Sequence, residues 1–241
     1  MAKIKITSNM VFERHEKKYL LTEAQYNQLI VPLTEHMQHD QYGLHTICSL
    51  YYDTDDFLLI RRSIEKPKYK EKLRLRCYGI PSQEDVVYLE LKKKLDGVTY
   101  KRRASMTLCE AEQYFSNGTP PEQAGQILNE IVWFKDRYHP MPKVLLFYNR
   151  IALYGIADSS LRITFDTNIR WRDEQLNFTN GDYGTQILSP GERLMEIKLT
   201  GAFPCWLSHL LSEQKIYPIS FSKYGMVYRK ILHKEEKRYV G

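Results

Sequence analysis

Positively charged and apolar side chains alternate along several segments of this chain, and this pattern restricts the fold more than any other feature. Lys72, Arg74 and Arg76 alternate with Leu73 and Leu75. Successive side chains of a β-strand point to opposite faces, so the three cations share one face and the leucines share the other. The pattern predicts strands that have one basic face and one apolar face.

The same alternation recurs in other segments. The polar members are Glu90, Lys92 and Lys94; Lys101 and Arg103; Tyr148 and Arg150; Arg162, Thr164, Asp166, Asn168 and Arg170; and Glu196 and Lys198. For any one strand, a solvated sheet face is the ordinary explanation. Across the whole set, however, Lys and Arg outnumber acidic residues, and like charges opposite each other on paired strands are destabilising. If the strands close into one barrel, we expect a basic lumen that needs an anionic ligand, such as a triphosphate or a longer phosphate chain.

The predicted fold class is mainly β (α+β), with peripheral helices. Strands are predicted at 47–52, 72–78, 86–94, 98–104, 144–154, 161–172 and 194–199, and Asp96-Gly97 is typical of a hairpin turn. Helices are predicted at 22–36, 122–138 and 202–214, with a short helix beginning at 53–55 and an extended tail at 221–228. The segment 13–18 is charged on both faces, so periodicity does not orient it. We expect a single domain over residues 1–241 whose sheet closes late in the sequence.

Charge and cysteine usage narrow the setting of the protein. The formal net charge of +6 indicates an anionic partner without selecting among nucleic acid, membrane surface and phosphate compounds. Cys48, Cys77, Cys109 and Cys205 form no C-x-x-C pair, which disfavours a zinc site and favours a reduced, intracellular chain. The polar first ten residues lack a secretory signal, and no apolar run approaches the roughly 20 residues of a membrane span. We expect a cytoplasmic protein that would need a partner chain to act at a membrane.

Several common catalytic motifs are missing from the sequence. It contains no G-x-x-x-x-G-K-[ST] phosphate loop, no G-x-G-x-x-G turn, no H-E-x-x-H pair and no G-x-S-x-G elbow. A phosphate-binding protein without a glycine-rich loop must use side-chain cations, which agrees with the alternation.

The order and spacing of short motifs resemble a known family from about Phe12 to Tyr228. The motifs are Arg14-x-Glu16-x-Lys18-Tyr19, Ser49-Leu50-Tyr51-Tyr52-Asp53, Leu73-Arg74-Leu75-Arg76-x-Tyr78-Gly79, Glu90-x-Lys92, Phe147-Tyr148-Asn149-Arg150, Arg162-Ile163-x-Phe165-Asp166-Thr167, Leu194-Met195-Glu196-Ile197-Lys198 and Phe221-Ser222-Lys223-Tyr224. Together they resemble the VTC domain, the polyphosphate polymerase module of the vacuolar transporter chaperone family. That domain belongs to the triphosphate tunnel metalloenzyme (CYTH-like) superfamily.

The resemblance implies a closed, antiparallel, eight-stranded β-barrel tunnel that binds a nucleoside triphosphate by its phosphates. The implied phosphate-binding residues are Lys18, Arg14, Arg74, Arg76, Lys92, Lys101, Arg103, Tyr148, Arg150, Lys198, Ser222 and Lys223. The implied catalytic residues are Arg74, Arg76, Lys92, Arg150 and Glu196. Glu196, together with Glu16, is the implied ligand of Mn²⁺ or Mg²⁺.

One departure affects the expected reaction. Hydrolytic branches of the superfamily open with E-x-E-x-K, whereas Arg14 takes the first acidic position here and leaves only Glu16. This favours transfer of the γ-phosphoryl group of ATP to a growing inorganic polyphosphate chain. A metal-dependent tunnel triphosphatase and a non-catalytic polyphosphate-binding module are the alternatives. Nucleic acid is not expected as a partner, because no recognition motif is present; a partner protein at a membrane is compatible with the resemblance.

Overall fold

The computed structural model describes residues 15–96, 98–119, 121 and 125–240, and for 233–240 it describes the backbone alone. The strands in this part of the chain are β1 (His15–Leu21), β2 (Met37–His39), β3 (His45–Asp53), β4 (Tyr69–Tyr78), β5 (Val86–Leu95), β6 (Val98–Thr107), β7 (Met141–Gly155), β8 (Arg162–Arg172), β9 (Thr185–Gln186) and β10 (Arg193–Leu199). The helices are α1 (Glu23–Leu33), α2 (Leu58–Ile64), α3 (Leu108–Ser116), α4 (Gln126–Tyr138), α5 (Cys205–Glu213) and α6 (Lys223–Val240), with a 3₁₀ turn at Phe178–Asn180. The predicted mainly β class with peripheral helices is confirmed.

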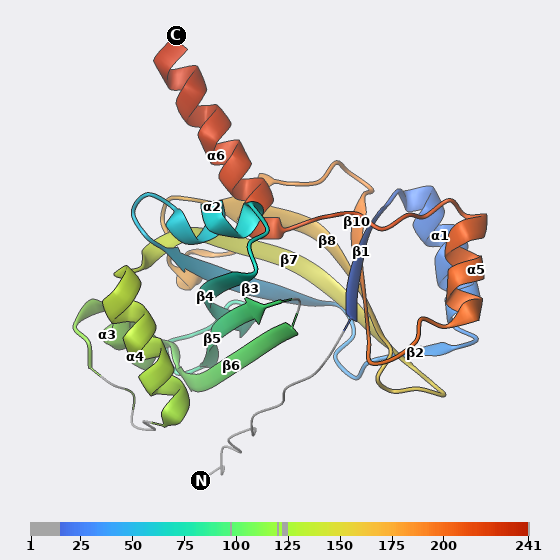
Figure 1. The fold of residues 1–241 in the computed structure, drawn as a ribbon, viewed down its shortest axis with the longest axis horizontal. Coiled ribbons are helices and arrows are strands. Elements are labelled where there is room, and N and C mark those ends of the chain that lie inside the picture. Colours follow the sequence, from blue (N-terminus) through green and yellow to red (C-terminus); the bar gives the residue numbers. More distant parts are fainter. Residues whose placement is uncertain (1–14, 97, 120, 122–124, 241) are drawn as a thin grey trace.

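One antiparallel sheet organises the molecule (Figure 1). Its strands follow the order β1-β10-β8-β7-β3-β4-β5-β6, while β2 adds to β7 and β9 adds to β8. Within the described residues β1 does not pair with β6, so the prediction of a closed barrel is wrong. The free edge of β1 is used differently, because the Ile219 amide donates to the Lys18 carbonyl at 2.7 Å. The segment that leads into α6 therefore lies along the edge of β1. A closed barrel would have required β6 to pair with this edge.

The apolar faces of the strands pack outward against two helical layers, as the alternation predicts. Leu73, Leu75, Leu89 and Leu91 are buried with residues of α3 and α4. At the other end of the sheet, β8, β10 and β1 pack against α1 and α5, which lie together on the right of Figure 1. Burial of these faces leaves the basic faces of the strands on the concave side of the sheet.

The helix α6 corrects a second prediction, since the sequence pattern predicts an extended segment at 221–228. Its side chains Tyr224, Val227 and Ile231 are buried at helical spacing against β3, β7 and β8. The Ser222 hydroxyl accepts a hydrogen bond from the Gly225 amide at 3.2 Å, which begins the helix. The rest of α6 extends away from the body of the molecule (Figure 1). The beginning of α6 thus closes one side of the concave face.

Other predicted elements are confirmed, with shifted ends. Thr22 begins α1 through a reciprocal capping box with Gln25, and the helix ends at Leu33. The helix predicted at 122–138 is α4, which starts at Gln126; residues 122–124 lie outside the described part. Strands β5 and β6 form the predicted hairpin, although Gly97 of its turn is also outside the described residues. Helix α3 was not predicted.

None of the helices in the described part of the chain combines the length and the apolar character needed to cross a membrane.

Candidate functional site

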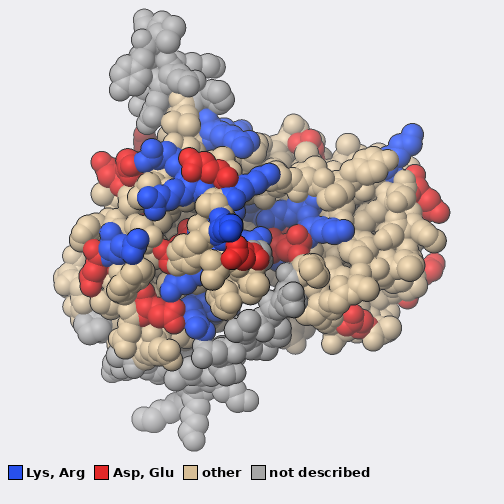
Figure 2. All heavy atoms as spheres, viewed as in Figure 1, with Lys and Arg blue, Asp and Glu red and all other residues tan. Residues whose placement is uncertain are grey.

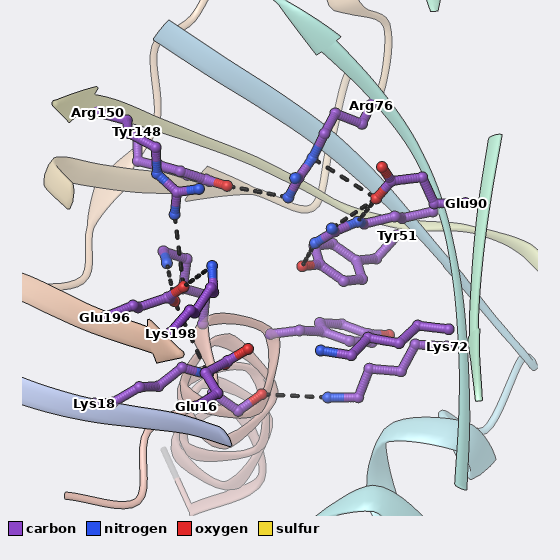
Figure 3. A pocket seen from close by; sticks show the side chains of 15 residues that line it. Glu16, Lys18, Tyr51, Lys72, Arg76, Glu90, Tyr148, Arg150, Glu196 and Lys198 are labelled. Carbon is purple, nitrogen blue, oxygen red and sulfur yellow. Dashed lines mark hydrogen bonds and ion pairs between the residues drawn. The ribbon is translucent and has the colours of Figure 1, made fainter. Parts of the chain in front are cut away.

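A cavity of about 160 Å³ lies on the concave side of the sheet, between the strands and the beginning of α6 (Figure 3). We call it the basic cavity. It is lined by Glu16, Lys18, Tyr51, Lys72, Arg74, Arg76, Glu90, Lys92, Tyr148, Arg150, Glu196, Lys198, Ser222, Lys223 and Tyr224. Eight of these residues are Lys or Arg and three are Glu. On the face seen in Figure 2, Lys and Arg side chains gather over the middle of the molecule, with acidic side chains beside them.

The structure brings most of the sequence-predicted residues together. Glu16, Lys18, Arg74, Arg76, Lys92, Tyr148, Arg150, Glu196, Lys198, Ser222 and Lys223 line the basic cavity. Lys101 and Arg103 lie on the edge strand β6 and contact Glu90, but they are not part of the lining. Arg14 lies outside the described residues.

Four lining residues were not predicted as site residues: Tyr51, Lys72, Glu90 and Tyr224. A signal for Lys72 was present, because it shares the face of Arg74 and Arg76 on one strand. Tyr224 lies in the segment that was predicted to be extended, and that prediction gave no reason to place its side chain in the cavity.

Glu90 is the anionic centre of one end of the cavity, and its side chain is only 1% exposed. Arg74 donates to its Oε2 atom through Nε at 2.8 Å and Nη2 at 2.7 Å. Lys101 reaches Oε1 at 2.7 Å, and Arg103 donates to the same oxygen through Nε at 2.9 Å. Arg76 is at 4.0 Å. Burial alone would raise the pKa of Glu90, but these four cations hold it well below its ordinary value, so the carboxylate stays ionised.

A second anionic centre lies at the other end, around Glu196 and Asp166. Arg150 donates to both oxygens of the buried Asp166, at 2.6 and 2.8 Å, and Lys223 contacts Asp166 at 2.5 Å. Glu196 is contacted by Lys198 at 3.0 Å, Lys223 at 3.3 Å and Arg150 at 3.8 Å. Burial would raise the pKa of Glu196, but Lys223, Lys198, Lys18 and Arg150 hold it well below its usual range. Asp166, which is on β8, does not line the cavity. The strand β8 therefore contributes to the site through the ion pairs of Asp166 with Arg150 and Lys223.

These contacts change the expectation of a lumen with concentrated repulsion. Carboxylates inside the fold neutralise much of the basic face, since Glu90 and Asp166 are each shared by cations from different elements. The strand faces do carry more Lys and Arg than acidic residues. The excess of positive charge inside the fold is nevertheless smaller than the sequence pattern suggests. An anionic ligand must compete with, or share, these internal partners.

Aromatic side chains fix the arginines of the cavity. Tyr51 accepts a hydrogen bond from Arg74 at 3.1 Å, and Tyr148 accepts one from Arg76 at 3.1 Å. Burial would raise the pKa of Tyr51, but Arg74, Arg76 and Lys72 lower it to about 8. Tyr224 stacks on Tyr51, with ring centroids 4.7 Å apart.

The beginning of α6 is anchored outside the cavity by a buried carboxylate. Asp53 accepts from the Tyr224 hydroxyl at 2.9 Å and from the amides of Leu59 and Ile60 at 2.8 and 3.0 Å. This contact joins β3, α2 and α6. It thereby places Ser222 and Lys223 at the cavity wall.

Glu16 and Glu196 are the carboxylates that could hold a metal ion. Lys18 lies directly opposite Glu196 in the pairing of β1 with β10, and its Nζ atom is 2.9 Å from Glu16 and 3.9 Å from Glu196. No group of three or more His, Cys, Asp or Glu residues in the described part of the chain forms a metal cage. Mg²⁺ in phosphoryl-transfer sites is commonly bound by one or two carboxylates, with phosphate and water completing its shell. The two glutamates fit an ion of this kind that enters with a phosphate compound.

Acid should destabilise the fold through Glu16. Burial raises the pKa of Glu16, but Lys18, Lys92 and Lys198 outweigh it and lower the pKa from 4.5 to about 2. A group whose pKa is lower in the folded state stabilises the protein above its unfolded pKa and loses that contribution as the pH falls. We expect the free energy of unfolding, measured with urea, to fall between about pH 4.5 and 2. In Glu16→Gln this fall should be shallower; an identical profile would show that Glu16 does not contribute to it.

The residues that line the basic cavity lie within a region that matches a known protein family. The VTC domain family matches residues 13–232 of the chain, which includes every lining residue of the basic cavity. The chain belongs to the VTC domain family. This confirms the resemblance drawn from the sequence motifs.

A curated VTC relative is much longer than this chain. It is the vacuolar transporter chaperone complex subunit 4 of Trypanosoma cruzi (strain CL Brener), 23% identical over 270 residues. The match covers 90% of this chain and 34% of the relative, so the chain spans about a third of that protein's length.

Two solved structures share the fold. One, described as a "putative adenylate cyclase" from Bacillus halodurans, has a TM-score of 0.51 and 16% identity, and the match covers 86% of this chain and 92% of the other. The second, from Hippeastrum, is described as a "putative adenylyl cyclase" with a dominant triphosphatase activity. It has a TM-score of 0.50 and 17% identity, over 89% of this VTC chain and 94% of the other. At these identities the likeness shows the fold alone.

Proposed function

We propose that this VTC domain is an ATP-dependent polyphosphate polymerase, which transfers the γ-phosphoryl group of ATP to the end of an inorganic polyphosphate chain. The observation that carries the proposal is the basic cavity, where eight Lys and Arg side chains stand beside three glutamates. A cavity with this balance suits a narrow, highly charged anion. Membership of the VTC domain family supports a role in polyphosphate chemistry, because the sequence motifs resemble the polyphosphate polymerase module of the vacuolar transporter chaperone family.

In this reaction the bond between the γ-phosphorus and the β–γ bridging oxygen breaks, and a bond forms between the γ-phosphorus and a terminal oxygen of the polyphosphate. ADP leaves. The attacking oxygen is already anionic, so no strong general base is needed, and the protein contributes alignment and charge neutralisation. Arg74, Arg76 and Arg150 would align the phosphates, since a guanidinium can donate two parallel hydrogen bonds. Lys18, Lys92 and Lys223 would add charge around them.

A divalent ion, Mn²⁺ or Mg²⁺, completes the proposal. Glu196 and Glu16 would hold it, and when bound it would neutralise charge on the phosphate oxygens. Lys198 and Lys18, which contact these glutamates, would then be able to contact phosphate.

Hydrolysis is the competing activity. It is the second candidate because the Hippeastrum protein, which shares the fold, is described as having a dominant triphosphatase activity. Tripolyphosphate or ATP would then react with water instead of with a phosphate chain. A binding module without turnover is the third outcome. The Trypanosoma relative is named as a subunit of a complex, so we include a partner protein in the proposal.

The deciding experiment incubates the purified chain with ATP and either Mn²⁺ or Mg²⁺, and resolves the products on a polyacrylamide gel stained for polyphosphate. We expect a ladder of long chains together with ADP. Free phosphate without polymer would instead assign the chain as a triphosphatase. Binding without any product under either metal would leave only the binding module.

A further inference from the structure

Aromatic side chains continue the concave face of the sheet beyond the basic cavity. Tyr78 lies on β4 two residues past the lining residue Arg76, and alternate residues of a strand share one face. Tyr88 on β5 lies directly opposite Arg76, and His45 on β3 lies directly opposite the lining residue Arg150. Directly opposed residues of paired strands point to the same side of a sheet. Three neighbouring strands therefore each place one ring beside the cavity, on the same face.

These rings form a continuous cluster, which we call the aromatic row: Tyr42, His45, Tyr78 and Tyr88. Neighbouring centroids along the row are 6.2, 6.0 and 5.9 Å apart, and the ring planes are inclined to each other by 71°, 55° and 74°. Because the rings do not stack on one another, they do not use up their own faces. Tyr42 is 67% exposed and Tyr78 is 50% exposed. An exposed apolar surface that adjoins a polar cavity is typical of a ligand-binding groove.

Polar contacts hold parts of the aromatic row in place. The Arg103 guanidinium lies over the ring of Tyr88, 4.4 Å from its centroid, and Arg103 in turn donates to Glu90 at 2.9 Å. The His45 Nδ1 atom donates to the carbonyl oxygen of Gly43 at 3.1 Å. A surface that is already ordered loses less conformational entropy when a ligand binds. The row is therefore arranged as a preformed binding surface.

A nucleoside triphosphate is the ligand that suits both the cavity and the row, because it joins a strongly anionic tail to a flat aromatic base. Two residues along a β-strand span about 7 Å, so Tyr78 lies beyond Arg76 by the scale of the ribose that separates a base from its phosphates. Aromatic side chains bind bases by stacking. An inorganic phosphate compound could enter the cavity, but it has no group that would gain from contact with the row.

We propose that the aromatic row is the base-binding site of this domain, where the base of a nucleoside triphosphate stacks on Tyr78 and Tyr88 while its phosphates lie in the basic cavity. Arg103 positions Tyr88. The row would distinguish a nucleotide from inorganic polyphosphate, which the cations of the cavity do not do by charge alone. This inference rests on the proposed function in taking a nucleoside triphosphate as the ligand; it does not require polymer synthesis.

The test compares two probes, ATP and inorganic tripolyphosphate, each titrated into the full chain by calorimetry without divalent metal. We expect Tyr78→Ala and Tyr88→Ala each to lower the affinity for ATP roughly 5-fold or more, as for the loss of a stacked base. Their affinity for tripolyphosphate should stay within twofold of the wild type, because this probe has no base. Tyr78→Phe keeps the ring and should keep the affinity for ATP.

Tyr183 provides the matched control. It is half-exposed, as Tyr78 is, and the Arg172 guanidinium lies 4.3 Å from its ring centroid, as Arg103 does from that of Tyr88. Tyr183 does not line the basic cavity. Tyr183→Ala should leave both affinities at the wild-type value, and a loss of ATP affinity equal to that of Tyr78→Ala would overturn the assignment of the base to the row.

The outcomes separate this inference from the proposed function. ATP affinities within twofold of the wild type in both Tyr78→Ala and Tyr88→Ala would overturn the base site, even if the wild type makes polymer. Wild-type protein that shows the expected losses but makes no polymer would overturn the polymerase proposal and still support the base site. A wild type that binds tripolyphosphate but not ATP would overturn the base site directly.

A further variant decides the case in which an alanine variant loses affinity for both probes through damage to the fold. Tyr78→Leu keeps an apolar side chain at the position but removes the aromatic face. We expect it to keep the affinity for tripolyphosphate and to lose affinity for ATP. Wild-type affinity for ATP in Tyr78→Leu would show that no base stacks there, and would overturn the proposal.

Discussion

A Glu196→Gln variant is expected to make polyphosphate at less than about one hundredth of the wild-type rate. In the proposed reaction Glu196 is the buried carboxylate that would hold the divalent ion, and a metal ion at transferring phosphates contributes several kcal/mol to stabilising the transition state. Glutamine keeps the shape of the side chain and removes its charge. The rate is measured as ADP released and polymer formed from ATP, over a range of Mn²⁺ concentrations.

The fold of this variant should survive, because three of the four cations around Glu196 keep another carboxylate partner and only Lys198 loses its ion pair within the described residues. Lys223 and Arg150 remain bound to Asp166, and Lys18 remains bound to Glu16. Circular dichroism and a melting curve verify this before rates are compared, and Glu35→Gln, a change at an exposed position after α1, serves as the control. Near-normal polymer synthesis by a folded Glu196→Gln protein would remove Glu196 from the mechanism.

The strands were predictable because burial imposes a period of two on them. Leu73 and Leu75 had to face a core, and their burial places Arg74 and Arg76 on the opposite face. The closure of the sheet was not predictable in the same way. Side-chain alternation reports which face a residue occupies, but it does not report which backbone edges pair, and here the edge of β1 meets Ile219.

The helix α6 was missed because the predicted segment stopped too early. Over 221–228 the apolar residues satisfy both an extended and a helical pattern, and only the continuation to Ile231 makes the helical spacing clear. The error mattered for the site, because Ser222 and Lys223 reach the cavity through the turn that begins this helix.

The electrostatic balance of the site also could not be derived from the chain alone. Glu90 is one acidic residue on a basic strand face, yet the register places it opposite Arg74 on one side and Arg103 on the other. One carboxylate can therefore hold cations from both neighbouring strands. The sequence predicts that the cavity carries net positive charge. The number of its cations that lack a carboxylate partner depends on the register of the strands.

The largest effect on stability is expected from Glu90→Gln, which should lower the free energy of unfolding by about 3–5 kcal/mol. The carboxylate is only 1% exposed and pairs with Arg74, Arg76, Lys101 and Arg103. Its loss would leave these cations close together without their shared counter-ion. Urea unfolding at pH 7 measures the change.

A matched variant separates this effect from the loss of any ion pair. Glu130→Gln also removes a carboxylate that binds two cations, Lys93 and Arg102, but its side chain is 24% exposed. Solvent screens such a pair, so we expect a loss of less than about 1 kcal/mol. Equal losses in the two variants would show that Glu90 is not the electrostatic centre of the site.

Added tripolyphosphate tests whether a bound phosphate compound can take the place of the Glu90 charge. If the basic cavity binds condensed phosphate, the ligand can replace part of the missing negative charge, and a ligand that binds only the folded state stabilises it by mass action. The melting temperature of Glu90→Gln should therefore rise more with added tripolyphosphate than that of the wild type. An equal rise would mean that the bound phosphates do not reach the arginines around Glu90, and would confine the ligand to the part of the cavity around Glu196.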